Sequence, residues 1–486
     1  TGPAELRVRA WHAEAILRRS AGDRPGAARA VRAGLAILDQ FQASLGATDM
    51  RTHAFAHAQD LARLGMELSI ESGRAASIFA AAERGRAGAL RFRPARPPDD
   101  VELAAELAEL RQVVTELRSG HVAARATLIA RQRVLELAVR DRARHAAGSG
   151  NGAVRPPSRA ALRDALGGRT LVEYIELDGD LLAVAVSAQR LTFHRLGPLA
   201  AAERALDALR TGLSWLALGV GSARSSAAVT EVVERSAREL DELLLGPLRG
   251  DSPLVIVPTG ALHAMPWSAL PSCANRTVCV APSAALWHRA ATHSRTSGGA
   301  VVLAHGPGLH HASDEVNALA QIYPNATPLS GTAARVASLL AALEGADVAH
   351  LAAHGHFRAD NPMFSALRFA DGPLTVYDLE RLAVPPRRVV LASCDSGLAS
   401  VSSGDELIGL AAALLAMGTV TLVAAVIPVP DEASQALMLR LHHHLTAGRT
   451  PAEALNHARL ETTGRPGGTS TGAAVAAAGF LCLGAG

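Results

Sequence analysis

Short apolar runs bounded by glycine-containing turns recur in the C-terminal half of the chain. Residues 348–353 (VAHLAA) are apolar apart from one histidine, and this run ends at His354-Gly355. Residues 389–393 (VVLAS) form a second run, which ends at the sequence CDSG, residues 394–397. Runs of this length between turn signals are typical of parallel strands that are buried on both faces. We therefore predict two such strands, whose carboxyl ends form the sheet edge where ligands and catalytic groups collect in α/β proteins.

Other apolar patterns predict further elements of the same α/β part. Alternating apolar and polar residues over 171–196 predict an antiparallel hairpin that turns at Asp178-Gly179. No charge occurs between Glu406 and Asp431, a run long enough to cross a bilayer, but glycines, threonines and Pro428 interrupt it. A buried helix followed by a strand explains this run without a membrane. The remaining predicted elements are helices over 199–246, 313–322 and 406–416 and strands over 254–257, 300–304 and 420–427.

The first 92 residues carry helical periodicity with repeated turns. Helices of about 15–20 residues, small residues at contact positions and short turns are typical of stacked helical hairpins of tetratricopeptide type. Because the first helix begins almost at residue 1, we expect the array to extend further upstream.

A proline-rich break at 93–100 precedes a leucine stripe in steps of four and three residues. With a second helix over 121–145, the stripe predicts an antiparallel helical hairpin whose leucines form an intramolecular core; a dimer seam is the alternative. The sequence GSGNGAVRPPS at 148–158 is typical of a linker. We thus divide the chain into a helical array (1–92), a hairpin (93–147), a linker (148–158) and an α/β domain (159–486), whose N-terminal subregion ends at residue 250 and whose core is 251–486.

Composition limits the classes of partner. Apolar residues make up 49% of the chain and charged residues 19%, which is enough apolar material for large cores. The 48 basic and 45 acidic residues nearly cancel, so we expect neither nucleic acid nor a membrane surface as a partner. Every basic residue is arginine, which fits the coding bias of a GC-rich genome. Four cysteines without a CxxC motif indicate a reducing, cytoplasmic setting.

A thiol and an imidazole end the two predicted strands. Cys394 directly follows one and His354 the other, and an imidazole near a cysteine favours the reactive thiolate and later protonates a leaving amine. The backbone amides of Gly355 and Cys394 are candidate donors for an oxyanion hole. An ordinary buried cysteine is the alternative for Cys394, although a core residue is not needed at such a turn. His305, in a similar LAHG sequence, is an alternative base that the residues alone leave open.

An ordered set of motifs resembles a known family. HLAAHG at 350–355, LASCDSG at 391–397, GDELIGL at 404–410 and VIPVPDE at 426–432 resemble the CHAT domain, the caspase- and separase-like cysteine peptidase module that is usually fused to tetratricopeptide repeats. The resemblance extends to PLVIVPTGALHAMPWSAL at 253–270, TPAEALNHARL at 450–460 and AAGFLCLG at 477–484, and thus covers about residues 155–486. Ile427 stands where the family often has tryptophan.

The resemblance implies an α/β fold with a caspase-like, mostly parallel sheet flanked by helices, preceded by the all-α repeat region and the helical hairpin. It implies a bacterial protein, and it favours His354 over His305 as the partner of Cys394. In separase-like relatives an acid at the position of Asp431 receives a basic substrate side chain, which implies a pocket for Arg or Lys. The alternative is that Asp431 only stabilises the N-terminus of the helix that begins there, and the two interpretations are evenly matched. Three further acids that are candidates for the same pocket are Asp395, Asp405 and Glu406; the last two are also candidate helix caps.

We therefore predict a cysteine endopeptidase that cleaves a protein substrate with Cys394 and His354 and is regulated by a protein activator through the repeats. A non-catalytic adaptor, in which the helical array recruits a partner, is the alternative. We expect no cofactor and no metal, because the spacing of His350, His354 and His356 lacks further ligands. We expect Cys273, Cys279 and Cys482 to be structural, and the consecutive histidines 442–444 to lie at the surface.

Overall fold

An eleven-stranded sheet runs through the part of the chain that the structure describes. The computed structural model describes residues 2–56, 58–86, 90, 100–119, 124–145, 154, 156–248, 250–293, 299–358, 360–392, 400–402, 406–464 and 470–486. The sheet order is β3-β2-β1-β4-β5-β16-β15-β12-β8-β6-β7. Its strands are β1 (Thr170–Leu177), β2 (Asp180–Val186), β3 (Leu191–Pro198), β4 (Leu254–Val257), β5 (Val278–Val280), β6 (Val301–His305), β7 (Thr327–Leu329), β8 (Val348–Ala352), β12 (Arg388–Leu391), β15 (Thr421–Ala425) and β16 (Phe480–Gly484).

Apart from the antiparallel strands β2 and β3 at one end, the sheet has two parallel groups that run in opposite directions. Strands β1, β4, β5 and β16 are parallel to one another, as are β15, β12, β8, β6 and β7. The antiparallel pair β15–β16 joins the two groups. The predicted hairpin is present as β1 and β2, and both of its turn residues have positive φ, 54° at Asp178 and 81° at Gly179, as a tight two-residue turn requires.

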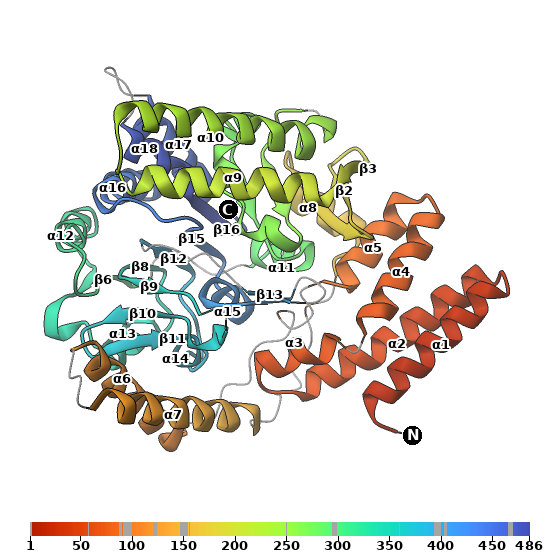
Figure 1. Ribbon diagram of the computed structural model, residues 1–486, viewed down its shortest axis with the longest axis horizontal. Coiled ribbons are helices and arrows are strands. Elements are labelled where there is room, and N and C mark those ends of the chain that lie inside the picture. Colours follow the sequence, from red (N-terminus) through yellow and green to blue (C-terminus); the bar gives the residue numbers. More distant parts are fainter. Residues whose placement is uncertain are drawn as a thin grey trace.

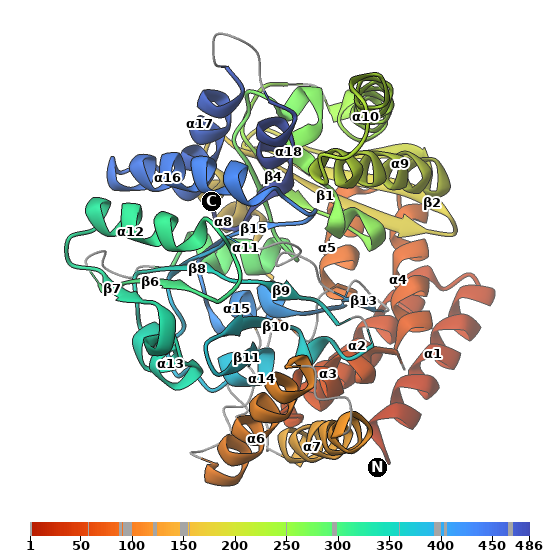
Figure 2. The same ribbon diagram turned by 60° about the vertical axis from the view of Figure 1, so that its left-hand side comes forward.

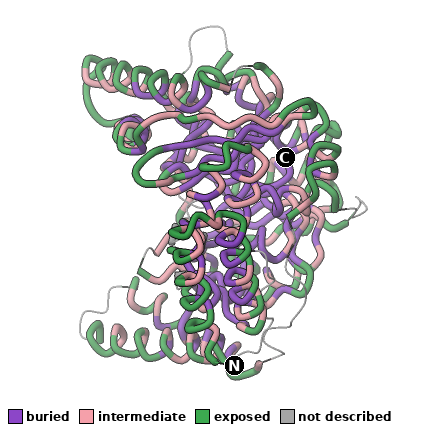
Figure 3. The backbone as a smooth tube through the Cα atoms, turned by 90° about the vertical axis from the view of Figure 1, so that its right-hand side faces the viewer, coloured by how far each residue is buried: buried purple, intermediate pink, exposed green. Residues whose placement is uncertain are grey.

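Helices cover both faces of the sheet, which explains why the central strands read as continuous apolar runs. Every residue of β8 and of β15 is buried. Figures 1 and 2 show α9, α10 and α16 to α18 gathered on one side of the sheet, and Figure 3 shows the buried residues concentrated in the interior of the molecule. The helices of this part are α8 (Arg159–Leu166), α9 (Leu199–Ala217), α10 (Ala223–Leu244), α11 (Ala284–Ala291), α12 (Ala312–Ile322), α13 (Val336–Leu343), α14 (Val376–Leu379), α15 (Leu410–Met417), α16 (Asp431–Thr446), α17 (Pro451–Thr463) and α18 (Thr471–Gly479).

Two small sheets accompany the large one. The first consists of β9 (Gly355–His356), β10 (Ala366–Phe369) and β11 (Gly372–Thr375), and the second of β13 (Ser400–Ser402) and β14 (Glu406–Ile408). The mixed α/β architecture with a mostly parallel sheet and a helical N-terminal region confirms the predicted fold class.

The N-terminal region is a stack of helical hairpins with a core of its own. Alanine, valine and leucine side chains of α1, α2 and α4 form this core, together with Phe55. Small residues allow close approach: a Cβ atom added at Gly34 would lie 2.4 Å from Leu61 Cδ2, and one at Gly65 would lie 2.8 Å from Val31 Cγ1. The helices are α1 (Ala4–Ser20), α2 (Arg24–Ser44), α3 (Thr48–Ala56), α4 (Gln59–Glu71) and α5 (Ala75–Arg84).

The leucine stripe lies on the first helix of a hairpin formed by α6 (Val101–Arg118) and α7 (Arg125–His145). Leu103, Leu107 and Leu110 are buried in the same core as the sheet, as the intramolecular interpretation predicts. The buried ion pair Arg111–Asp378, at 2.9 Å, fastens α6 to α14.

One predicted element differs from the structure. The helix predicted over 406–416 begins only at Leu410, because residues 406–408 pair with β13 as strand β14. The predicted helical stretch over 199–246 is present as two helices, α9 and α10, separated at 218–222, where Gly219 and Gly221 have positive φ. Among the described residues no helix is both long enough and apolar enough to cross a membrane.

Candidate active site

The strands that carry the two candidate catalytic residues are neighbours. β8 and β12 pair in parallel, with Leu351 opposite Leu391, and Ala392 N donates to Leu351 O at 3.0 Å, so the pairing continues one residue beyond β12. Strand β15 pairs in parallel with the other side of β12. The carboxyl ends of all three strands therefore meet at one edge of the sheet. Cys394 and Asp395 lie outside the described residues.

His354 is exposed just beyond β8, and backbone groups hold its position. Its Nε2 atom lies 3.2 Å from the carbonyl oxygen of Gly308, and its own carbonyl oxygen accepts a hydrogen bond from Arg368 N at 2.9 Å. A carbonyl oxygen only accepts, so Nε2 carries the proton in this contact and Nδ1 has the free lone pair when the ring is neutral. Gly308 has a φ of 88°, and a Cβ atom there would lie 2.4 Å from Arg368 Nη2 and 3.3 Å from the His354 ring.

His305, the alternative base, lies one strand further from β12 than His354 does. His305 ends β6, which pairs with β8 on the side opposite β12, and its register partner is Ala352. Its Nδ1 atom lies 3.2 Å from Gly306 O. Both histidines therefore occupy the same sheet edge, but only the strand of His354 is adjacent to β12.

A cavity of about 570 Å³ opens beside His354. The small sheet β9–β10–β11 forms one wall, to which Gly355 contributes, and the hairpin α6–α7 forms another with Leu110, Val114 and Glu136. Arg358 joins the two walls, because its Nη1 donates to Glu136 Oε1 at 2.5 Å. The helical hairpin is thus part of the surroundings of the candidate base, which its sequence did not indicate.

Asp431 is the first residue of α16, just beyond β15. Its Oδ2 accepts a hydrogen bond from His311 N at 3.2 Å, which ties the start of α16 to the start of α12. An acid in the first turn of a helix also interacts favourably with the helix dipole. These contacts fit the helix N-terminal interpretation, and the pocket interpretation stays a prediction. Ile427 is fully buried and packs against Gly479.

Of the other three predicted pocket acids, the structure describes only the backbone of Glu406. Asp405 lies outside the described residues, and Glu406 begins β14. Among the described residues no group of three or more His, Cys, Asp or Glu side chains is arranged to hold a metal ion.

A buried polar network lies under the site, on the α12–α16 face of β8. His350 Nε2 lies 2.8 Å from Glu315 Oε1, His350 Nδ1 lies 3.1 Å from His442 Nε2, and His442 Nδ1 lies 3.0 Å from the hydroxyl of Tyr323. Burial, and next the neighbouring His350, lower the pKa of His442 well below its usual 6.5, and burial raises the pKa of Tyr323 to about 12.

The network corrects one prediction: His442 was expected at the surface but is completely buried. Its position four residues after buried Met438 and three before Leu445 was the available signal. Glu315 shows the same signal, since it lies three residues after Ala312 and four before Leu319.

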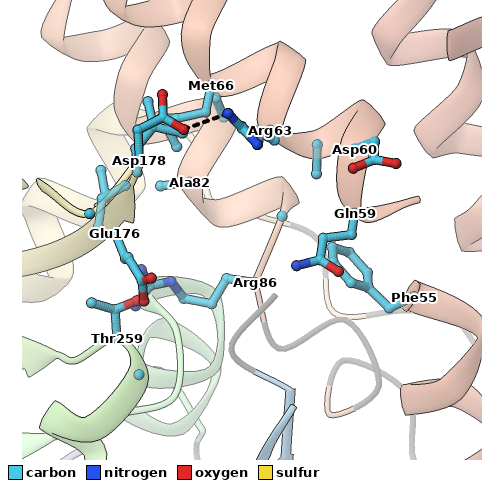
Figure 4. A pocket seen from close by; sticks show the side chains of 17 residues that line it. Phe55, Gln59, Asp60, Arg63, Met66, Ala82, Arg86, Glu176, Asp178 and Thr259 are labelled. Atoms are coloured by element: carbon cyan, nitrogen blue, oxygen red, sulfur yellow. Dashed lines mark ion pairs between the residues drawn. The ribbon is translucent and has the colours of Figure 1, made fainter. Parts of the chain in front are cut away.

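A second cavity, of about 470 Å³, lies between the helical region and the carboxyl ends of β1 and β4. These two strands run opposite to β8, so this cavity is at the other edge of the sheet. Figure 4 shows Arg63 reaching from α4 to Asp178 in the hairpin turn, at 2.6 Å, and Glu176 beside Thr259. Charges of both signs line it, so its composition selects no ligand class.

Comparison with known families decides the identity of the α/β part. The model of the CHAT domain matches residues 234–478, which is half of the chain. The chain belongs to the CHAT domain family. A search of curated proteins finds no match. The CHAT match includes β8, β12 and β15 and therefore the edge where they end.

Solved structures of separase share this fold. The separase in a separase–securin complex from Saccharomyces cerevisiae matches with a TM-score of 0.54 at 10% identity over 90% of this chain, and a second structure of that complex matches with 0.51 at 10% identity over 95%. The CHAT chain spans only 37% of the length of that separase in either case. The arginine-specific cysteine proteinase gingipain R gives a TM-score of 0.35 at 11% identity, covering 58% of this chain and 75% of its own. The separase matches show that the CHAT protein has a separase-like fold.

Proposed function

We propose that this CHAT protein is a cysteine endopeptidase whose nucleophile is Cys394 and whose proton carrier is His354. The observation that carries the proposal is the parallel pairing of β8 with β12, because both residues follow the carboxyl ends of adjacent strands. The family's fold is that of cysteine peptidases, and the motif residues stand in this chain in the family's order.

The proposed reaction has two stages. The Cys394 thiolate adds to the scissile carbonyl carbon, and the amides of Gly355 and Cys394 stabilise the resulting oxyanion. The C–N bond then breaks, and the leaving amine takes a proton from protonated His354, whose Nδ1 is the transferable site because Nε2 contacts Gly308 O. In the second stage water gives a proton to His354 and attacks the thioester, which releases the carboxylic acid and restores the thiolate.

We further propose that the primary pocket accepts Arg or Lys. Asp431, at the carboxyl side of β15, is the principal candidate, and Asp395, Asp405 and Glu406 are candidates for added negative charge. A carboxylate pairs well with a guanidinium where water is partly excluded. Cleavage of Arg- and Lys-containing peptides in preference to Asp-containing ones is the expected specificity.

A labelling experiment tests the nucleophile. Burial raises the pKa of Cys273 to about 12 and that of Cys279 to about 11, and burial also raises the pKa of Cys482, so these thiols should be unreactive. A thiol-reactive peptide electrophile, followed by mass spectrometry, should modify Cys394 in the wild type. The Cys394→Ala variant should show neither labelling nor cleavage of a panel of Arg, Lys and Asp peptides. Equal cleavage by both proteins would remove Cys394 from the mechanism.

The helical region is proposed to regulate this peptidase when a protein activator binds. Glu83, at the end of α5, accepts hydrogen bonds from the amides of Ala284 and Ala285 at 2.7 and 2.9 Å. From the other end of the same helix α11, Arg289 donates to Leu415 O at 2.6 Å, at the end of α15. These contacts link α5 to α15 through α11, and α15 follows the segment that contains Cys394 in the sequence.

Two further contacts fasten the helical region to the CHAT domain. Leu90 packs with Leu286, Ala412 and Ala416 in a small buried cluster that joins the end of the region to α11 and α15. The hydroxyl of Thr48 in α3 donates to Glu380 at 2.7 Å, next to α14. A partner that moves the region would therefore act on α11, α14 and α15 together. We propose that the region is a tetratricopeptide-type array and that the protein works in a bacterial cytoplasm.

A non-catalytic adaptor is the second candidate function, favoured by the large share of the chain that forms helical hairpins, which offer extended binding surfaces. An adaptor would capture its protein partner equally well with Cys394→Ala and would resist the electrophile. Stoichiometric labelling of Cys394 would contradict it.

A further inference from the structure

A groove of about 520 Å³ lies in the helical region, between α2 and α5 and over α4. Five arginines line it, three from α2 and two from the turn before α5 and from α5 itself, and none of the described residues that line it is acidic. The five are Arg24, Arg29, Arg32, Arg74 and Arg84. The whole chain carries a net charge of only +3, so the positive charge in this groove is a local feature and does not reflect a basic protein overall.

Acidic side chains near the groove neutralise only part of this charge. Arg24 Nε lies 3.4 Å from Glu71 Oε2. Burial lowers the pKa of Arg84, the neighbouring Arg32 lowers it further, and Asp39 acts in the opposite direction. Arg84 is half-buried and Arg32 is exposed, and two neighbouring like charges of this kind are stabilised when an anion binds between them.

The floor of the groove is apolar and made of small aliphatic residues. Val31, Leu35 and Leu68 are buried beneath it, and alanines of α4 and α5 complete it. None of the described lining residues is aromatic. Proteins that bind single-stranded nucleic acid combine positive charge with aromatic side chains on which bases stack. An aliphatic floor between guanidinium groups fits instead a peptide in which carboxylates alternate with small aliphatic side chains.

We propose that this arginine groove is the docking site for an acidic segment of a partner protein. Its Asp and Glu side chains pair with the five guanidinium groups, and its aliphatic side chains cover the floor. The groove is formed within the helical region, and all of its lining residues lie between Arg24 and Arg84. The proposal therefore does not depend on peptidase activity.

Fluorescence anisotropy with the full chain tests the proposal. The probe is a fluorescein-labelled synthetic peptide built from Glu-Ala-Leu-Glu blocks, and its uncharged control has Gln in place of Glu. The wild type should bind the acidic peptide at least tenfold more tightly than the Gln peptide, with affinity that falls as salt rises. The variant R29Q/R32Q/R74Q should bind the acidic peptide roughly tenfold more weakly, because the loss of each exposed ion pair should weaken binding by a factor of about two.

Two matched variants separate docking from folding and from net charge. R224Q/R235Q/R238Q removes the same number of exposed arginines from α10 and should bind like the wild type. R29K/R32K/R74K keeps the charge and should retain most of the binding. Three outcomes would overturn the proposal: equal binding of the acidic and Gln peptides, equal loss in the groove and α10 variants, or tighter binding of a labelled oligothymidylate than of the acidic peptide.

Discussion

Glu83 and Ala284 are 201 positions apart in the sequence, yet the carboxylate of Glu83 accepts a 2.7 Å hydrogen bond from the amide of Ala284 and so binds the helical region to the first turn of α11. We expect Glu83→Ala to lower the free energy of unfolding by about 3 kcal/mol, because a buried charged acceptor is lost and two amide donors lose their partner. Chemical denaturation measures this loss, and hydrogen exchange at residues 284–291 should accelerate.

Glu239 on α10 is an exposed control: Glu239→Ala should change the free energy of unfolding by less than about 0.5 kcal/mol. Unchanged exchange at the start of α11 in Glu83→Ala would contradict the proposed connection between α5 and α11.

A buried carboxyl group makes stability depend on pH. Burial is the largest influence on Glu380 and raises its pKa from 4.5 to about 7; Asp49 also raises it, whereas Thr48 and Arg51 oppose the rise. Between these values the folded state holds a proton that the unfolded state has released, so stability should fall as pH rises from 4.5 to 7. Glu380→Gln cannot ionise and should be more stable than the wild type above pH 7, by up to about 3 kcal/mol.

Thermal denaturation of the wild type and Glu380→Gln across this pH range measures the difference. The two stabilities should converge well below pH 4.5, where the wild-type carboxyl group is protonated in both states. A difference that is constant with pH would show that Glu380 does not titrate as expected.

The buried histidine pair predicts the opposite dependence. Because the pKa of His442 in the folded protein lies well below 6.5, only the unfolded state takes up a proton at this residue as pH falls below that value. The wild type should therefore lose stability relative to His442→Gln by up to about 1.4 kcal/mol per pH unit below 6.5.

Denaturant titrations at several pH values test this slope. His310→Gln, at an exposed position before α12, is the control and should keep the wild-type slope. The same slope in His442→Gln would assign the acid sensitivity to other groups.

His354 and His305, which lie at the same sheet edge, should differ in their effect on catalysis. We expect His354→Gln to lower kcat/KM for a cleaved peptide by roughly a hundredfold to ten-thousandfold, the usual contribution of a proton-transfer group. His305→Gln should stay within about threefold, because β8 separates its strand from β12. Steady-state kinetics on the Arg and Lys peptides measures both. A larger loss in His305→Gln than in His354→Gln would reverse the assignment.

Local sequence patterns predicted the elements that carry the site. The apolar run at 348–353 became β8, and Asp178-Gly179 became the turn of a hairpin, because burial on both faces and positive φ each restrict which residues are accepted. The patterns failed where a distant partner decided the outcome. Residues 406–408 pair with β13 instead of continuing the following helix, and His442 is buried because Tyr323 and His350 supply its hydrogen bonds.

The sequence by itself determined that a thiol and an imidazole each follow a buried strand, since apolar runs and turns are local properties of the chain. Only the tertiary structure decided that β8 and β12 are neighbours, that α6 and α7 wall the cavity at His354, and that arginines of α2 and of the α5 segment share one groove. Strand order and helix packing depend on which apolar surfaces, distant from one another in the sequence, pack together and exclude water. The local spacing of residues does not specify which of these surfaces pair.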